Sequence, residues 1–413
     1  MSRSLFASFI LAASLAVPAA AQAGQAQMEL PDGPGKPLVQ AVCTTCHQVN
    51  MIQNSSGYSR EHWQELIGYM ADLKGRPELA TISDYLAKNF PPNTKRQSTP
   101  VAGTTQIAVK SWIVPTLGQR ARDPVETADG MIWWNGQFGN VVGRLNPKTG
   151  EMKEWMLPAE SLPHSITPDA AGNIWFTGNG NGTMGRLDPR TGDIKVYKMP
   201  DPMAKDPHTA EFDRNGTLFF TLQQSNMIGR LVPSTGEIKL VKMPRNRSLP
   251  YAIKVAADGF LWVACNGSNC IVRVDPKTME IKEFNLPQAG TTVRRLALDS
   301  TGTIWFVNSG LGYVGRLNPN TGEVKEWPSP SGRASHPYAL EVVNDIVWYN
   351  ESGVRPDMLV RFDPKTEKFQ SWPIITGNVH AGIARHIRKT RDGNNLLIHQ
   401  SGTNQISLVT IQK

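Results

Sequence analysis

The sequence predicts a small all-α domain followed by an all-β seven-bladed propeller. Three observations support this fold class: an apolar segment at the N-terminus, a Cys-x-x-Cys-His motif at residues 43–47, and a repeat of about 43 residues from residue 105 onward. These features follow one another along the chain. They divide it into a leader, a helical domain, a linker and a propeller.

The first 23 residues have the pattern of a secretory signal peptide. Arg3 precedes an apolar run over residues 5–17, and the alanines that follow fit the small-x-small rule for signal-peptidase cleavage. The run is shorter than the roughly 20 residues that a membrane span needs, so an uncleaved anchor is the weaker alternative. No later segment is apolar enough to span a bilayer. We therefore expect a periplasmic protein whose mature chain has no membrane span.

The charges favour anionic partners over nucleic acid. The chain has 43 basic and 35 acidic residues, for a formal net charge of +8 at pH 7. These charges are scattered, with no block of Lys and Arg interleaved with aromatic residues, so we expect no nucleic-acid partner. A modest positive field attracts small anions or an acidic protein.

The motif of Cys43, Cys46 and His47 is typical of covalent haem attachment. Two thiols three residues apart lie on one side of a helical turn, where both can form thioethers to the porphyrin. The next residue then brings its imidazole to the iron. A disulfide and half of a zinc site are the alternatives, but a zinc site needs two further ligands and no second cluster follows nearby. We expect one haem c.

The sixth iron ligand should come from a predicted helix over about residues 59–74. Met70 lies in the apolar stripe of this helix, at three- and four-residue spacing from its neighbours. Met51 follows His47 by one helical turn and cannot easily reach the opposite haem face. We therefore expect Met70 to be the ligand, with His62 as the alternative. A further helix, about 79–89, stops at Pro91.

The residues of this segment also point to a family. They are Cys43, Cys46, His47, Arg60, Trp63, Met70, Gly75, Tyr85, Leu86, Phe90 and Pro91. Together they resemble the compact mono-haem cytochrome c domains over about residues 36–92, within a domain that we place at 28–92. The resemblance implies a haem c with His/Met ligation and a role in electron transfer. Because one haem carries one electron at a time, the expected partner is a periplasmic redox protein.

A polar linker at residues 93–104 leads into the propeller at 105–413. Each repeat has an apolar strand with a central aromatic residue, then a turn, a second strand, a Thr-Gly turn and an edge strand. The aromatic residues are 42, 44, 43, 43 and 43 residues apart: Trp133, Trp175, Phe219, Trp262, Trp305 and Trp348. Four strands per repeat of this length are typical of propeller blades.

The two ends of the repeat region should form the seventh blade together. Residues 394–412 supply its inner strands but stop before an edge strand. Residues 106–115 supply the missing strand, so the ring closes and leaves no open sheet edge.

Polar residues recur about eleven positions before each blade aromatic, where the innermost strand begins beside the axial channel. They are Arg122, His164, His208, Tyr251, Arg294, Tyr338 and Arg385. A water-filled channel alone would favour polar residues there. Guanidinium and imidazole groups also suit carboxylates and phosphates. We call these seven residues the channel ring and expect it to bind a small anionic ligand.

The repeats resemble the propeller of the streptogramin B (virginiamycin B) lyase family across nearly all of residues 105–413. The resemblance implies the same fold. Lyases of that family use a histidine base near a magnesium ion held by glutamates and a histidine. Here Glu351 lies at a comparable place, on a blade that also offers His336, but the ring residue of that blade is Tyr338. Arg294 replaces an expected metal-binding histidine on the preceding blade, and arginine neither acts as a base at neutral pH nor attracts a cation.

Cys265 and Cys270 flank a predicted hairpin turn. In an oxidising compartment a disulfide between them is expected. A metal site is the alternative, but it lacks partner ligands.

The sequence therefore predicts an exported c-type cytochrome that relays single electrons through one haem. Its propeller would bind a small anion or a redox partner, alone or as part of a dehydrogenase. One alternative is a non-redox C–O lyase similar to streptogramin B lyase, or another propeller enzyme, with an accessory haem domain. Another is a propeller that serves as an interaction scaffold without chemistry.

Overall fold

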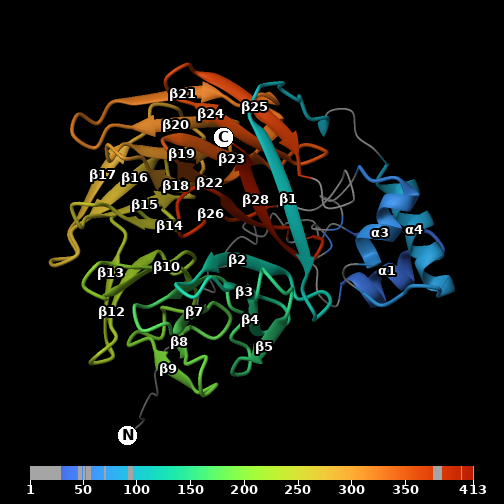
Figure 1. Cartoon of the computed structure of the whole chain (residues 1–413), viewed down its shortest axis with the longest axis horizontal. Helices are drawn as coiled ribbons and strands as arrows, with labels where there is room; N and C mark the ends of the chain where they lie inside the picture. Colours follow the sequence, from blue (N-terminus) through green and yellow to red (C-terminus); the bar gives the residue numbers. More distant parts are fainter. Residues whose placement is uncertain are drawn as a thin grey trace, which may run out of the picture.

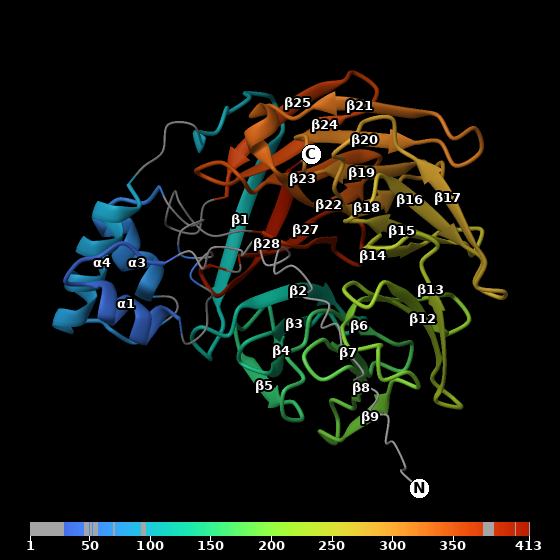
Figure 2. The ribbon, with the colours of Figure 1, turned by 180° about the vertical axis from the view of Figure 1, so that it is seen from behind.

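Among the residues that the structure describes, seven four-stranded antiparallel sheets form a closed ring, and three α-helices lie to one side of it, beyond strand β1 (Gln106–Ile113) (Figures 1 and 2). This computed structural model describes residues 29–44, 49, 52, 57–68, 71–91, 96–374, 384–400 and 402–412. The predicted seven-bladed propeller is confirmed, and a short helical region precedes it. No helix within those ranges is long and apolar enough to cross a membrane.

The helical region packs around its own apolar core. Its described residues form the helices α1 (Lys36–Cys43), α3 (Arg60–Gly68) and α4 (Pro77–Asn89). Trp63, Ile82 and Leu86 are buried among them. Helix α4 begins two residues before its predicted start, since Pro77 is favourable at a first helical position, where its missing N–H costs no hydrogen bond.

The first six blades each contain four strands that are consecutive in sequence. The first blade contains β2 (Ala121–Glu126), β3 (Ile132–Gly136), β4 (Val141–Leu145) and β5 (Met152–Met156). The second contains β6 (Ile166–Pro168), β7 (Ile174–Gly178), β8 (Thr183–Leu187) and β9 (Ile194–Lys198). The third contains β10 (Pro207–Phe212), β11 (Leu218–Leu222), β12 (Met227–Val232) and β13 (Glu237–Lys242). The fourth blade contains β14 (Pro250–Val255), β15 (Leu261–Cys265), β16 (Cys270–Val274) and β17 (Ile281–Asn285). The fifth contains β18 (Val293–Leu298), β19 (Ile304–Asn308), β20 (Tyr313–Leu317) and β21 (Val324–Pro328). The sixth contains β22 (Pro337–Val343), β23 (Ile346–Glu351), β24 (Met358–Asp363) and β25 (Lys368–Pro373). The first strand of each blade lies next to the first strands of the neighbouring blades, around the axial channel.

The seventh blade joins the two ends of the propeller. It consists of β26 (Ile387–Lys389), β27 (Leu396–Gln400), β28 (Gln405–Gln412) and β1 (Gln106–Ile113). Strand β1 pairs with β28 along its whole length, from Gln106 opposite Gln412 to Ile113 opposite Gln405. The ring is thus closed by backbone hydrogen bonds between the start and the end of the propeller.

A glycine in the third strand makes room for an aromatic residue of the second strand. Phe176 on β7 pairs directly with Gly185 on β8, and a Cβ at Gly185 would lie 2.0 Å from the Phe176 ring. Trp134 and Gly143 form the same kind of pair in the first blade. This close contact fills the space between neighbouring blades.

The segment predicted as a linker is held along the sixth blade. The backbone N–H of Arg355 donates to the carbonyl oxygen of Arg96 at 2.6 Å. Further along, Val101 and Ser371 exchange two hydrogen bonds of 2.9 Å. Residues 96–105 are therefore docked on the propeller over most of their length.

The predicted disulfide is not formed. Cys265 and Cys270 are buried free thiols on either side of the turn that joins β15 to β16. The two thiols hydrogen-bond to each other, and the hydroxyl of Ser268 lies 3.3 Å from the sulfur of Cys270. Hydrogen bonds therefore satisfy both cysteines without a covalent link.

Candidate functional site

The structure brings all seven residues of the channel ring into one network of contacts. Five of them begin the inner strands β2, β10, β14, β18 and β22, while His164 and Arg385 lie just before β6 and β26. They come from seven different blades, so only the closed propeller assembles them. Residues about eleven positions before each blade aromatic therefore lie side by side in the folded chain, and their role as a binding site stays a prediction.

One side of the ring is a row of side chains in contact, whose aromatic rings are tilted against one another. Nη2 of Arg122 lies 2.7 Å from Nε2 of His164, and the rings of His164 and His208 are 3.5 Å apart between centroids. The rings of His208 and Tyr251 follow at 4.2 Å. Because arginine only donates, His164 accepts through Nε2, and its Nδ1 donates to the backbone oxygen of His208 at 3.1 Å. His164 is therefore a neutral imidazole.

The other side of the ring is a pair of tyrosines under two arginines. The hydroxyl groups of Tyr251 and Tyr338 hydrogen-bond to each other. The guanidinium carbon of Arg294 lies 4.5 Å from the centre of the Tyr338 ring, and Nη1 of Arg385 donates to the Tyr338 hydroxyl at 3.3 Å. Arg120, which the sequence interpretation missed, is half-buried and also lies near both tyrosines.

The ring backbone is fixed by polar side chains from the preceding blades. Nδ2 of Asn135 on β3 donates to the carbonyl oxygen of Pro163, just before His164, at 2.6 Å. The hydroxyl of Thr221 on β11 donates to the carbonyl oxygen of Tyr251 at 2.8 Å. These buried bonds set the positions of His164 and Tyr251 relative to the preceding blades.

A β-bulge at the start of several inner strands turns two consecutive side chains toward the channel. In β18 the register shifts between Val293 and Leu296, so Arg294 and Arg295 both fall within the bulge. The same shift occurs in β10, β14 and β22, and in β2 it lies one residue later, between Arg122 and Val125. Bulges re-aim side chains in this way. A second layer of polar residues therefore lies directly beside the ring.

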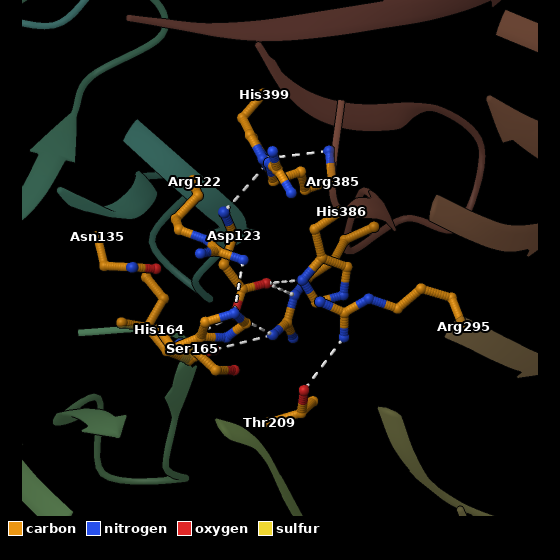
Figure 3. A network of polar contacts seen from close by, with 12 residues as sticks. Arg122, Asp123, Asn135, His164, Ser165, Thr209, Arg295, Arg385, His386 and His399 are labelled. Carbon is orange, nitrogen blue, oxygen red and sulfur yellow. Dashed lines mark hydrogen bonds and ion pairs between the residues drawn. The ribbon is translucent and has the colours of Figure 1, made fainter. Parts of the chain in front are cut away.

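Asp123 is the centre of this second layer (Figure 3). Its carboxylate accepts hydrogen bonds from Arg388, at 3.1 and 3.2 Å, and from the backbone N–H of Ile166 at 3.0 Å. It also pairs with His386, and its own N–H donates to Nδ1 of His399 at 3.2 Å. Burial acts to raise the pKa of Asp123, but Arg388 and His386 hold it well below its usual value. Asp123 is therefore ionised, and both of its carboxylate oxygens have partners.

The channel ring itself is cationic, because its arginines have no carboxylate partner among the described residues. Arg122 donates to Gln137 and His164, and Arg385 donates to Tyr338. Burial lowers the pKa of Arg122 to about 10, which still leaves it charged at neutral pH. Burial, together with nearby arginines, lowers the pKa values of His164 and His208 well below the usual range. The ring thus presents fixed positive charge beside neutral imidazoles.

These surroundings suit an organic anion of carboxylate or phosphate type. Guanidinium groups recognise such groups through paired hydrogen bonds. A carboxylate would place negative charge beside the buried Arg122 and the half-buried Arg294 and Arg385.

A protein-family model supports the identification of the propeller. The model for the virginiamycin B lyase family matches residues 108–376, which is more than half of the chain. The chain belongs to the virginiamycin B lyase family. Residues before 108, including the helical region, lie outside the match.

Solved structures of family members share the fold. Virginiamycin B lyase from Staphylococcus aureus is 23% identical, with a TM-score of 0.66, over 74% of this chain and 99% of that chain. A streptogramin B lyase structure is 24% identical, with a TM-score of 0.66, over 74% of this chain and 98% of that chain. Hydrazine synthase from Kuenenia stuttgartiensis is more distant, at 12% identity and a TM-score of 0.59, over 72% of this chain and 97% of that chain. No curated protein matches the chain.

Glu351, which the family resemblance singles out, has a structural role here. It is fully buried and accepts hydrogen bonds from the hydroxyl of Ser329 at 2.6 Å and the N–H of Ser331 at 2.9 Å. His336 lies before β22, with Nδ1 3.1 Å from the hydroxyl of Ser352. Within the described ranges, no group of three His, Cys, Asp or Glu side chains is placed to hold a metal ion.

The predicted haem ligands lie largely outside the described residues. Cys46, His47 and Met70 all fall outside the described residues, so the haem ligation stays a prediction. Cys43 ends α1, half-buried against the helical core. Nδ1 of His62, the alternative ligand, lies 3.1 Å from the hydroxyl of Ser59 at the start of α3.

Proposed function

We propose that the propeller acts on a small organic anion, which it holds at the channel ring through Arg122, Arg294 and Arg385. One observation carries this proposal: three arginines from separate blades converge where no described carboxylate neutralises them. Charge that is removed from water is costly unless it is paired, and Arg122 is buried while Arg294 and Arg385 are half-buried, so an anion that enters the ring can form charge-assisted hydrogen bonds with them.

The ring suits chemistry that begins with the removal of a proton next to a carboxylate. Such a step places negative charge on the carboxylate, and prearranged guanidinium groups stabilise that charge. Neutral imidazole and phenol groups beside the arginines can exchange the proton. Elimination and isomerisation both begin in this way.

Oxalate, a small dicarboxylate that is ionised at neutral pH, is a suitable probe of the site. Isothermal titration of the full chain with oxalate should show binding. The Arg294→Gln variant should bind about tenfold or more weakly, because a hydrogen bond to a charged group contributes about 1.5–3 kcal/mol. Lys325→Gln, on the outer strand β21, is the matched control and should bind like the wild type. Equal affinity in all three proteins would contradict the proposal.

Membership of the family raises a second candidate, lyase-type opening of a cyclic ester. A catalytically inactive virginiamycin B lyase from Staphylococcus aureus has been solved with quinupristin. Elimination opens such a ring without a change of mass, so chromatography of quinupristin incubated with the protein detects it. We expect no conversion, because Arg294 and Tyr338 occupy ring positions that differ from the family pattern. Conversion would favour the lyase reaction.

The N-terminal region adds a redox function to this proposal. Its Cys-x-x-Cys-His motif begins at the end of α1, and Cys43 packs against an apolar core that suits a porphyrin edge. A haem c bound there would supply one-electron transfer to a periplasmic redox protein. The signal-peptide pattern supports export, which that attachment requires.

Covalent haem can be tested directly on the purified protein. The wild type, produced in a host with haem-attachment machinery, should retain haem after denaturation, whereas a Cys43→Ala/Cys46→Ala double variant should lose it. Met70→Ala should alter the spectrum of the oxidised haem, and His62→Ala should not. Absence of covalent haem in the wild type would exclude the relay.

A further inference from the structure

Tyr338 has the most cationic surroundings of any phenol described in the propeller. Its side chain is only 5% exposed, at the start of β22. Arg294 lies over its ring at 4.5 Å and Arg385 at 5.4 Å from the ring centre. The Tyr338 oxygen accepts a hydrogen bond from Nη1 of Arg385 at 3.3 Å.

The partner tyrosine is less exposed to these charges. The Arg294 guanidinium lies 5.8 Å from the ring centre of Tyr251, although Arg295 lies nearer, at 5.1 Å. Arginine is only a donor, and Arg385 donates to Tyr338. When the Tyr251 hydroxyl also donates, the Tyr338 oxygen accepts two hydrogen bonds. Two donated bonds favour a phenolate at Tyr338 and a protonated Tyr251.

The charged and titratable groups that face Tyr338 come from every neighbouring element. They are Arg120 and Arg122 at β2, Tyr251 on β14, Arg294 on β18, His336 before β22, and Arg385 before β26. None of them is a carboxylate. Burial acts to raise the pKa of Tyr338, but Arg294, Arg385 and Arg122 together hold it well below its usual value.

From this arrangement we infer that Tyr338 is the proton acceptor of the channel ring, toward a carboxylate substrate with an acidic C–H bond next to the carboxylate. The inference rests on the proposed function. In the step, a bond forms between the Tyr338 oxygen and the proton while the C–H bond breaks. The electron pair stays on the substrate and spreads into the carboxylate, which the arginines hold. No oxidant or reductant takes part.

One consequence can be measured without the natural substrate. An anion in the ring neutralises part of the arginine charge, which raises the pKa of Tyr338. Binding of oxalate near neutral pH should therefore be accompanied by the uptake of up to about one proton.

Titrations with oxalate in two buffers of different ionisation enthalpy measure this proton uptake. The wild type and Tyr313→Phe, a control on β20 away from the ring, should take up protons to the same extent. Tyr338→Phe should still bind oxalate but lose the uptake. Unchanged uptake in Tyr338→Phe, or its loss only in His208→Gln, would overturn the inference.

A second measurement separates this inference from the proposed function. The ultraviolet absorbance of phenolate at neutral pH should be present in the wild type and Tyr313→Phe and absent in Tyr338→Phe. If oxalate fails to bind the wild type, the anion site is wrong, and this absorbance still decides the state of Tyr338. If oxalate binds but the phenolate signal does not depend on Tyr338, only the proton acceptor is wrong.

Discussion

Arg388 and Asp123 form a forked ion pair across the joint between the last and the first blade. Nε and Nη2 of Arg388, on β26, lie 3.1 and 3.2 Å from the two carboxylate oxygens of Asp123 on β2. The closing blade is therefore tied to its neighbour at the channel, in addition to the pairing of β1 with β28 that completes the closing blade itself.

Replacement of Asp123 by Asn should weaken the propeller strongly. Loss of one partner of a buried ion pair typically costs about 3–5 kcal/mol, since the other charge stays buried. Denaturant unfolding of Asp123→Asn should show a loss of this size. Asp193→Asn, at an exposed turn, is the control and should leave the unfolding free energy nearly unchanged. Similar effects in both variants would contradict this role.

Asp123 should also make stability depend on acid pH. Its pKa in the folded chain is held well below the value of about 3.9 expected after unfolding. Its contribution is therefore fully present above about pH 4 and lost as the pH falls through the folded pKa. The unfolding free energy of the wild type should decline below about pH 4, and that of Asp123→Asn should decline less. Parallel pH profiles would show that other groups are responsible.

The fold and the ring could be predicted from the sequence because both repeat. The blade aromatics and the Thr-Gly turns recur at nearly constant spacing, and a fixed offset from them locates Arg294 and Tyr338. The second layer could not be found in this way. Strict alternation along a strand turns Asp123 and Arg295 away from the channel, and the bulges that turn them inward have no sequence signature here.

Two other features of the structure differ from the sequence prediction: the state of the cysteine pair and the docking of the linker. Spacing across a hairpin turn shows that Cys265 and Cys270 are close, but not whether they are oxidised or hydrogen-bonded. The polar composition of the linker gives no sign that Val101 pairs with Ser371, because those hydrogen bonds join residues far apart in sequence.

Replacement of Gly185 by alanine should destabilise the propeller, because Gly185 is in close contact with Phe176. A Cβ at Gly185 would meet the Phe176 ring at 2.0 Å, so Gly185→Ala should cost about 1–3 kcal/mol through overpacking. Gly68→Ala is the matched control, because no atom lies within 4 Å of its added Cβ. Thermal unfolding should show a lower Tm only for Gly185→Ala. An unchanged Tm would mean that Phe176 repacks freely.

The hydroxyl of Thr221 should affect both stability and binding. It donates to the carbonyl oxygen of Tyr251, and Thr221→Val leaves that buried carbonyl without this partner, at a cost of about 1–3 kcal/mol. Oxalate should also bind more weakly, since Tyr251 is then less well positioned. Thr235→Val, at an exposed turn, should change neither property. A stability loss with unchanged oxalate affinity would limit Thr221 to a structural role.

Strand β1 should be essential for a soluble propeller, whereas the helical region should not. A chain that begins after residue 113 exposes the edge of β28, and open edges promote association. Light scattering should detect its aggregation. A chain that begins at residue 96 keeps β1 and the docked linker and should remain monodisperse. Aggregation of both chains would show instead that the helices protect the propeller.

A crystal structure of the protein soaked with oxalate tests the anion site most directly. Oxalate should lie in the channel ring, within hydrogen-bond distance of Arg294 and Arg385. Oxalate bound only elsewhere, such as the open surface pocket beside Lys198 and Lys205, would contradict it.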